Sequence, residues 1–217
     1  MRILALSDEQ YPAFYEQYTE GRFREYDLIL SCGDLSPEYL SFIVTVSHRP
    51  VLYVPGNHDG KYEKHPPEGC DCIDDKLVVY KGLRILGLGG CRRYHPGPYQ
   101  YTDREMRRRI RKLKWKLWWH RGVDIVVTHG APEGIGDDED IAHRGFGAFV
   151  KLMDKYKPRY LLHGHTHLNY KQGAPRELTY KDTRVINVFC QYTLEIPDDT
   201  IIPTKKKGDL KYLNYIV

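Results

Sequence analysis

Polar side chains that can bind metal ions follow five apolar segments of the chain. These segments are residues 3–6, 27–31, 51–54, 124–128 and 159–162. The side chains that follow them are Asp8, Asp34, Asn57, His58, Asp59, His129, His163, His165 and His167. Carboxylate oxygen, amide oxygen and imidazole nitrogen are ligands of divalent ions such as Mn, Fe and Zn. Two such ions that share a carboxylate form a common hydrolytic centre.

The five segments have the composition of β-strands, and three further segments resemble them. Val, Ile, Leu and Tyr dominate these segments, and Gly, Pro, Asp or Asn bound them. Several are continuous apolar runs, which is typical of strands covered on both faces. The predicted strands are residues 2–6, 27–31, 51–54, 77–80, 84–88, 124–128, 159–163 and 184–189.

Amphipathic or loop segments separate the predicted strands. The alternation of strands and helices favours an α/β fold with mostly parallel or mixed sheets. Ligands of such sheets bind at the carboxyl ends of the strands, which is where the polar side chains are placed. The predicted helices are residues 11–24, 37–47, 103–121 and 144–156.

The order of the polar motifs resembles that of the calcineurin-like metallophosphoesterase superfamily. Short pieces such as Gly-Asp occur by chance in many chains, whereas the ordered set is specific. The resemblance covers residues 8–167 and implies an α/β fold, a four-layer double β-sandwich flanked by helices. The motifs in order are Asp8-x-Gln10, Gly33-Asp34, Gly56-Asn57-His58-Asp59, His129 and Gly164-His165-Thr166-His167.

The resemblance also implies two divalent metal ions at one edge of the sandwich, Mn²⁺ or Fe, Zn, Ni or Mg. Asp34 would bridge both ions. Glycines next to the ligands would allow the tight turns that bring the chain close to an ion. The remaining ligands would be Asp8 and His167 for the first ion, and Asn57, His129 and His165 for the second.

Residue 10 departs from the family pattern, which usually has a histidine there. Side chains two residues apart on an extended segment point the same way, so Gln10 could reach the same ion as Asp8. An amide oxygen is a poorer donor than imidazole for Mn, Fe or Zn. Three arrangements stay open: weak binding of the first ion through Gln10, a water in its place, or an empty first site.

The reaction implied is hydrolysis of a phosphodiester or a phosphomonoester. A hydroxide that bridges the ions would attack phosphorus, because bound ions lower the pKa of water. His58 would protonate the leaving oxygen or stabilise charge on the phosphoryl group. Asp59 would orient His58 through a hydrogen bond. The absence of a cap domain in the sequence pattern favours diesters.

Two further segments lie near the metal motifs in sequence. Arg92, Tyr94 and His95 precede a basic segment and could either bind substrate phosphate or be solvated loop residues. Asp140 and His143 could either support the metal ligands or form an acidic first turn of a helix.

Residues 104–121 carry nine Arg or Lys against one Glu, a net charge of +8, which leaves −4 for the rest of the chain. Apolar residues at helical spacing from Met106 to Leu117 predict an amphipathic helix at about 103–121, inserted on the core. Its basic face is either a solvated surface or a site for nucleic acid. Its tryptophans could stack on bases, although packing in the core is the more common role. The alternative function is therefore a degenerate phosphoesterase fold that binds a phosphorylated partner or nucleic acid.

The composition suits one metallophosphoesterase domain over residues 1–217, because a 41% hydrophobic content can fill a packed core. The N-terminal apolar run is too short for a signal peptide, and no run is long enough to span a membrane. Five cysteines without paired CxxC spacing favour free thiols in a reducing compartment. We therefore expect a cytoplasmic protein with no membrane partner. The tail from residue 193 is predicted to form a hairpin.

Overall fold

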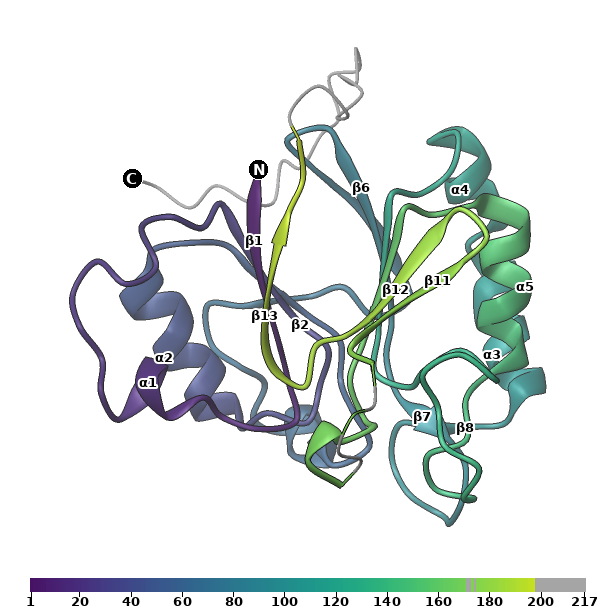
Figure 1. Ribbon diagram of the computed structural model, residues 1–217, viewed down its shortest axis with the longest axis horizontal. Coiled ribbons are helices and arrows are strands. Elements are labelled where there is room, and N and C mark those ends of the chain that lie inside the picture. Colours follow the sequence, from purple (N-terminus) through teal and green to yellow (C-terminus); the bar gives the residue numbers. More distant parts are fainter. Residues whose placement is uncertain (171–172, 174, 198–217) are drawn as a thin grey trace.

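Two β-sheets pack face to face in the computed structural model, and helices cover the outer face of each sheet (Figure 1). The structure describes residues 1–170, 173 and 175–197. The predicted hairpin beyond residue 193 therefore lies mostly outside the described residues. The arrangement confirms the predicted mixed α/β fold with two main sheets flanked by helices.

The first sheet has the strand order β13-β1-β2-β3-β4. Strands β1 to β4 are parallel, and β13 pairs antiparallel with β1. The strands are β1 (Arg2–Ser7), β2 (Leu28–Ser31), β3 (Val51–Tyr53), β4 (Asp71–Cys72) and β13 (Cys190–Glu195).

The second sheet has the strand order β11-β12-β10-β9-β6-β5. Its four central strands are parallel, and the two edge strands, β5 and β11, are antiparallel to their neighbours. The strands are β5 (Lys76–Tyr80), β6 (Leu83–Leu88), β9 (Ile125–Thr128), β10 (Tyr160–His163), β11 (Glu177–Tyr180) and β12 (Thr183–Asn187). A separate parallel pair is formed by β7 (Cys91–Arg92) and β8 (Gln100–Tyr101).

Both faces of the two sheets are buried. On β1, Ile3 and Ala5 belong to the core between the sheets, whereas Leu4 and Leu6 pack under the helices that cover the first sheet. This division follows from the alternation of side chains along a strand. Continuous apolar runs therefore correctly predicted strands covered on both faces.

Helices α1 (Pro12–Tyr15) and α2 (Pro37–Ser47) cover the first sheet. Helices α3 (Asp103–Lys112), α4 (Lys114–Trp119) and α5 (Gly147–Tyr156) cover the second. Two short 3₁₀ helices, η1 (Asp59–Glu63) and η2 (Leu168–Tyr170), follow metal motifs.

All eight predicted strands are present, but two helix predictions need correction. The helix predicted at 11–24 is limited to α1, which ends at Tyr15, and Gly21 further along has a φ of 83°, which a right-handed helix cannot contain. The helix predicted at 103–121 is divided at Leu113, which ends α3 and begins α4. The short or edge strands β4, β7, β8, β11 and β13 were not predicted.

One basic residue of α3, Arg109, is buried. Its guanidinium donates to the carboxylates of Asp74 and Asp75 and, at 2.8 Å, to the carbonyl oxygen of Gly89. The guanidinium carbon also lies 4.3 Å from the ring centroid of Tyr101. These contacts join α3 to the loop before β5 and to the end of β6.

Replacement of Arg109 by methionine is expected to lower the free energy of unfolding by about 3 kcal/mol, because it leaves the largely buried Asp74 carboxylate without its cation. Urea unfolding measures the change. The matched variant Arg108→Met, at an exposed position of the same helix, should stay within about 0.5 kcal/mol of the wild type. Equal stability of the two variants would contradict the assignment.

Candidate metal centre

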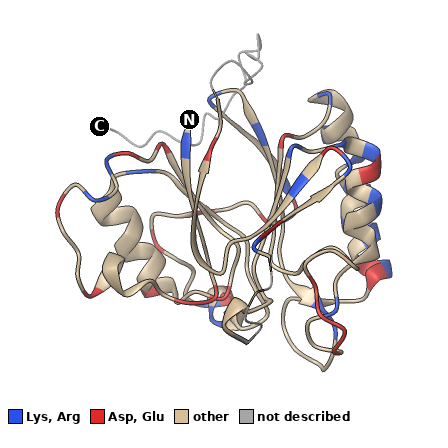
Figure 2. Cartoon of the chain, in the orientation of Figure 1, with Lys and Arg blue, Asp and Glu red and all other residues tan. Residues whose placement is uncertain are grey.

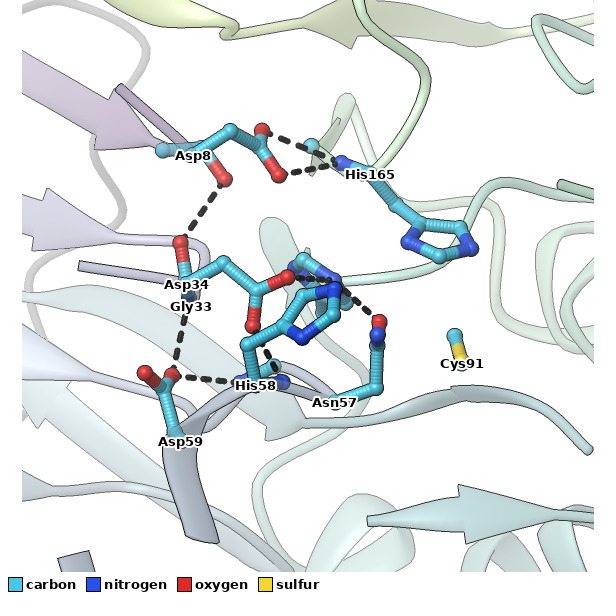
Figure 3. Close-up of polar contacts among 12 residues, drawn as sticks. Asp8, Gly33, Asp34, Asn57, His58, Asp59, Cys91 and His165 are labelled. Carbon is cyan, nitrogen blue, oxygen red and sulfur yellow. Dashed lines mark hydrogen bonds and ion pairs between the residues drawn. The ribbon is translucent and has the colours of Figure 1, made fainter. Parts of the chain in front are cut away.

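Five strand ends bring the polar motifs together at one end of the sandwich. Strands β1, β2 and β3 of the first sheet are followed by Asp8, Asp34 and Asn57, and β9 and β10 of the second by His129 and His165. The loops are joined by backbone hydrogen bonds. Asp8 N donates to Gly33 O at 3.1 Å, and Gly164 N donates to His129 O at 3.0 Å. Figure 3 shows the resulting cluster.

His129 is fully buried at the centre of this cluster. Its Nδ1 lies 2.8 Å from the carbonyl oxygen of Cys32, to which it donates. Its Nε2 lies 3.0 Å from Asn57 Oδ1 and 3.2 Å from Asp34 Oδ2. If the imidazole is neutral and its proton is on Nδ1, then Nε2 carries no proton. Nε2 is then a hydrogen-bond acceptor that faces two oxygen atoms, which are acceptors as well. Three converging acceptors require a cation among them, either a proton or a metal ion.

The protonation of this group follows from its surroundings. Burial disfavours the charged form of His129, but the carboxylate of Asp34 outweighs it and raises the pKa of His129 to about 9. Burial likewise disfavours the charged form of Asp34, but His129 lowers the pKa of Asp34 to about 2. In the metal-free protein the proton therefore stays on His129 at neutral pH.

His165 completes a group that fits a divalent ion. Asp34, His129 and His165 each offer a ligand atom within 4.8 Å of the others. His165 Nε2 lies 2.8 Å from the carbonyl oxygen of Ala142, so it donates there and leaves Nδ1 as the acceptor. Burial and the charge of His129 lower the pKa of His165 to about 3. A neutral imidazole next to a carboxylate is a suitable donor set for a borderline metal.

The residues expected to hold another ion lie beside this group. The Asp8 carboxylate accepts from His165 N at 3.0 and 3.1 Å, and His167 Nε2 lies 3.8 Å from Asp8 Oδ1. Burial raises the pKa of Asp8. Asp8 thus links the Gly-His-x-His motif to the end of β1.

The backbone before Gln10 differs from the extended segment expected. Asp8 has a φ of 67°, so residues 8–10 are not an extended segment and the two side chains need not point the same way. Gln10 is exposed, and its Nε2 donates to Ser36 Oγ at 3.1 Å. Since Ser36 is the N-cap of α2, the Gln10 amide contacts the start of that helix.

Asp59 also makes contacts other than the one expected. Its Oδ2 accepts from Asp34 N at 2.8 Å and from Gly56 N at 2.7 Å. Burial and the nearby Asp34 charge raise the pKa of Asp59 to about 7. The carboxylate therefore joins the loops after β2 and β3.

His58 is exposed at the mouth of the centre. Its backbone N–H donates to Asp34 Oδ1 at 2.8 Å. The ring extends toward Asp34 and Asn57 in Figure 3. The imidazole is thus available to a molecule that approaches these residues from solvent.

Two motif glycines allow side chains to approach the backbone closely. A Cβ atom on Gly56 would lie 2.1 Å from Asp34 Oδ1. A Cβ atom on Gly164 would lie 1.9 Å from Ser7 Oγ and 2.5 Å from Asp8 Oδ2. All three distances are far below van der Waals contact, so any larger residue would displace a candidate ligand.

Of the predicted substrate-binding residues, Tyr94 contacts the centre directly. Asn57 Nδ2 donates to Tyr94 Oη at 3.3 Å, which turns Asn57 Oδ1 toward His129. The ring of His95 packs edge-on against Tyr94, with centroids 4.3 Å apart. Arg92 instead donates to Glu133 and to the carbonyl oxygen of Gly145.

Asp140 and His143 lie near the centre. His143 Nδ1 lies 2.8 Å from Asp140 Oδ2, and the His143 ring centroid is 5.1 Å from that of His165. The groups that sequence reasoning missed are the carbonyl oxygens of Cys32 and Ala142, which fix the tautomers of two histidines. No residue type marks a backbone carbonyl, so the sequence offered no signal for them.

Metal affinity is expected to increase with pH, by about tenfold per unit between about pH 6.5 and 8.5, because the metal must displace the His129 proton. A histidine whose pKa is raised on folding contributes stability that is complete below about pH 6.5 and is lost as pH rises through about 9. The gain in Tm on addition of Mn²⁺ should therefore be larger at about pH 8.5 than at about pH 6.5. His129→Gln should abolish this difference. The same gain at both pH values in the wild type would contradict the prediction.

Removal of the Gln10 side chain is expected to leave metal affinity unchanged within about twofold, because its amide contacts Ser36. Titration with Mn²⁺, followed by thermal unfolding, measures the affinity of Gln10→Ala. Asp34→Asn serves as the comparison, since it removes a ligand charge and should weaken binding by about tenfold or more. A large loss of affinity in Gln10→Ala would show that the amide binds the ion.

Comparisons with known proteins agree with the geometry. Residues 1–169, which include every expected metal ligand, match the family described as Calcineurin-like phosphoesterase. Metallophosphoesterase domain-containing protein 1 of Homo sapiens and its namesake of Mus musculus are each 30% identical over 126 residues, 56% of this chain. The chain spans 37% of the length of these curated relatives.

Solved structures share the fold at low sequence identity. One has a TM-score of 0.65 and 15% identity, and covers 89% of this chain and 94% of its own. Another, TT1561 of Thermus thermophilus, has a TM-score of 0.58 and 16% identity, and covers 87% of this chain and 89% of its own. The family model matches residues 1–169, which is most of the chain, and the chain therefore belongs to the calcineurin-like phosphoesterase family.

Proposed function

We propose that this protein is a metal-dependent phosphoesterase that hydrolyses a phosphodiester or a phosphomonoester, with diesters as the favoured class. The observation that carries the proposal is the convergence of Asn57 Oδ1 and Asp34 Oδ2 on His129 Nε2, at 3.0 and 3.2 Å. Members of the family are mostly phosphoesterase hydrolases, which supports the same class of reaction.

The residues of this chain would divide the metal-binding task between its two sheets. Divalent metal ions, when bound, supply Lewis acidity that neutralises charge on phosphoryl oxygens and lowers the pKa of water. Asp34, with one carboxylate oxygen facing His129, is the candidate for the shared ligand. The others are Asn57, His129 and His165 for one ion, and Asp8 and His167 for another.

His58 is the candidate for protonating the leaving oxygen or for stabilising charge on the phosphoryl group. Its backbone N–H is held by Asp34, while its ring is exposed beside the ligands. An imidazolium in this position can give its proton to the leaving oxygen as the ester bond breaks. Tyr94 would keep the Asn57 amide oriented with its oxygen toward the metal. Asp59 would support His58 and Asn57 by holding the loops of Asp34 and Gly56 together.

With Mn²⁺ present, the protein is expected to hydrolyse bis(p-nitrophenyl) phosphate, and His58→Ala should lower kcat by about 10² to 10⁴-fold. Release of p-nitrophenolate measures the rate. The variant should keep the metal-induced gain in Tm, because His58 is not a ligand. His65→Ala replaces an exposed histidine outside the centre and should retain wild-type activity.

The competing proposal is a phosphoesterase fold that only binds its partner. It predicts no metal-dependent turnover of any generic monoester, diester or cyclic phosphate, together with intact metal binding. Equal rates for the wild type and His58→Ala would also argue against the catalytic role assigned here.

A further inference from the structure

The three tryptophans of the chain all lie on α4 and point to solvent. Trp115 is 75% exposed, Trp118 67% and Trp119 62%. The expectation that they pack in the core was wrong, because Leu113 and Leu117 already fill the buried side of this segment. Adjacent exposed indoles form an apolar patch of the kind that marks an interaction site.

Exposed basic side chains adjoin these indoles in sequence. Figure 2 shows Lys and Arg along the helices on this side of the molecule, and the sequence places further basic residues on and next to α4. The acidic residue of the segment 104–121, Glu105, already contacts Arg93. We call Trp115, Trp118 and Trp119 with these cations the tryptophan platform. Its exposed cations are Arg111, Lys112, Lys114, Lys116 and Arg121.

The tryptophan platform lies at the opposite end of the second sheet from the metal centre. Helix α4 ends at Trp119, shortly before β9 begins at Ile125, and β9 ends beside His129. Figure 1 places α4 at the far end of the strands from the site-bearing loops. An occupant of the platform would therefore leave the metal centre open to substrate.

We propose that the tryptophan platform binds the surface of a membrane that carries anionic lipids. Indole combines an apolar body with an N–H donor, which suits the boundary between headgroups and acyl chains. Exposed Lys and Arg side chains beside it are attracted to the negative surface potential of anionic headgroups. The charge of the platform thus complements the lipid surface, and its indoles supply the apolar contact.

The geometry of the indoles favours a lipid surface over a nucleic acid strand. Proteins that bind single strands offer the faces of aromatic rings to successive bases. The rings of Trp115 and Trp118 are instead perpendicular, at 89° with centroids 6.0 Å apart, so the edge of one covers the face of the other. Helix α4 is short and lies at one corner of the molecule, so a flat membrane surface can approach it.

Surface binding needs no membrane-spanning segment. Among the described residues, no helix is long and apolar enough to cross a bilayer. The expectation of no membrane partner followed from the lack of a long apolar run in the sequence, which bears on spanning a membrane and not on binding its surface. A segment that lies on the headgroups depends instead on apolar contact and electrostatic attraction.

Tryptophan fluorescence tests this directly, because every tryptophan of the chain is on the platform. Vesicles of phosphatidylserine mixed with phosphatidylcholine should shift the emission of the full chain to shorter wavelength and co-sediment with it at low salt. High salt, or phosphatidylcholine alone, should weaken both effects, since the attraction is electrostatic.

Two double variants separate the contributions of charge and apolar contact. Lys114→Glu with Lys116→Glu, and Trp115→Ala with Trp118→Ala, should each reduce co-sedimentation by about tenfold or more while circular dichroism stays unchanged. The matched control is Ile141→Ala, which removes a side chain as exposed as Trp115 from outside the platform. It should bind vesicles like the wild type.

Three results would overturn the proposal, of which two concern the wild-type protein. One is the absence of both co-sedimentation and an emission shift with phosphatidylserine vesicles at low salt. The other is tighter binding to a single-stranded oligonucleotide that quenches the emission, which would assign the platform to nucleic acid. Wild-type vesicle binding by both folded double variants would likewise exclude this surface.

Discussion

The imidazole of His129 joins the two sheets at the candidate metal centre. One nitrogen donates to the carbonyl oxygen of Cys32, which follows β2 of the first sheet, although His129 itself follows β9 of the second. The other nitrogen faces Asp34 and Asn57. Closure of the sandwich at this end and assembly of the acceptor group are therefore the same event. Each sheet supplies part of the group, and neither could form it alone.

Much of the fold and of the candidate site could be predicted because the relevant signals are local. Apolar runs of the right length indicated the central strands, and the polar residues at their ends indicated Asp34, Asn57, His129 and His165. The contacts of Gln10 and Asp59 could not be predicted in the same way. The left-handed conformation of Asp8 redirects the chain, and Asp59 finds its partners among backbone amides of two other loops. Such contacts depend on chain path and not on residue type.

In the basic segment, too, contacts between residues distant in sequence could not be predicted. Helical periodicity correctly identified Met106, Leu113 and Leu117 as buried, but it could not distinguish Arg109 from the arginines next to it. The partners of Arg109, Asp74 and Asp75, are distant from it in sequence. Likewise, residue type favoured buried tryptophans, whereas the leucines had already filled the available space.

Three of the motif positions hold no ligand atom at all. Gly33 has a φ of 96° and lies against the backbone of Gly56, Gly56 lies against the Asp34 carboxylate, and Gly164 lies against Ser7 and Asp8. Because these glycines have no side chain, neighbouring backbone and carboxylate groups can approach them closely, and the ligand atoms can therefore reach their positions. Anyone transplanting this centre onto another scaffold would have to copy those gaps before the donors. A graft that kept every carboxylate and imidazole but filled the gaps would possess the right chemistry in the wrong place.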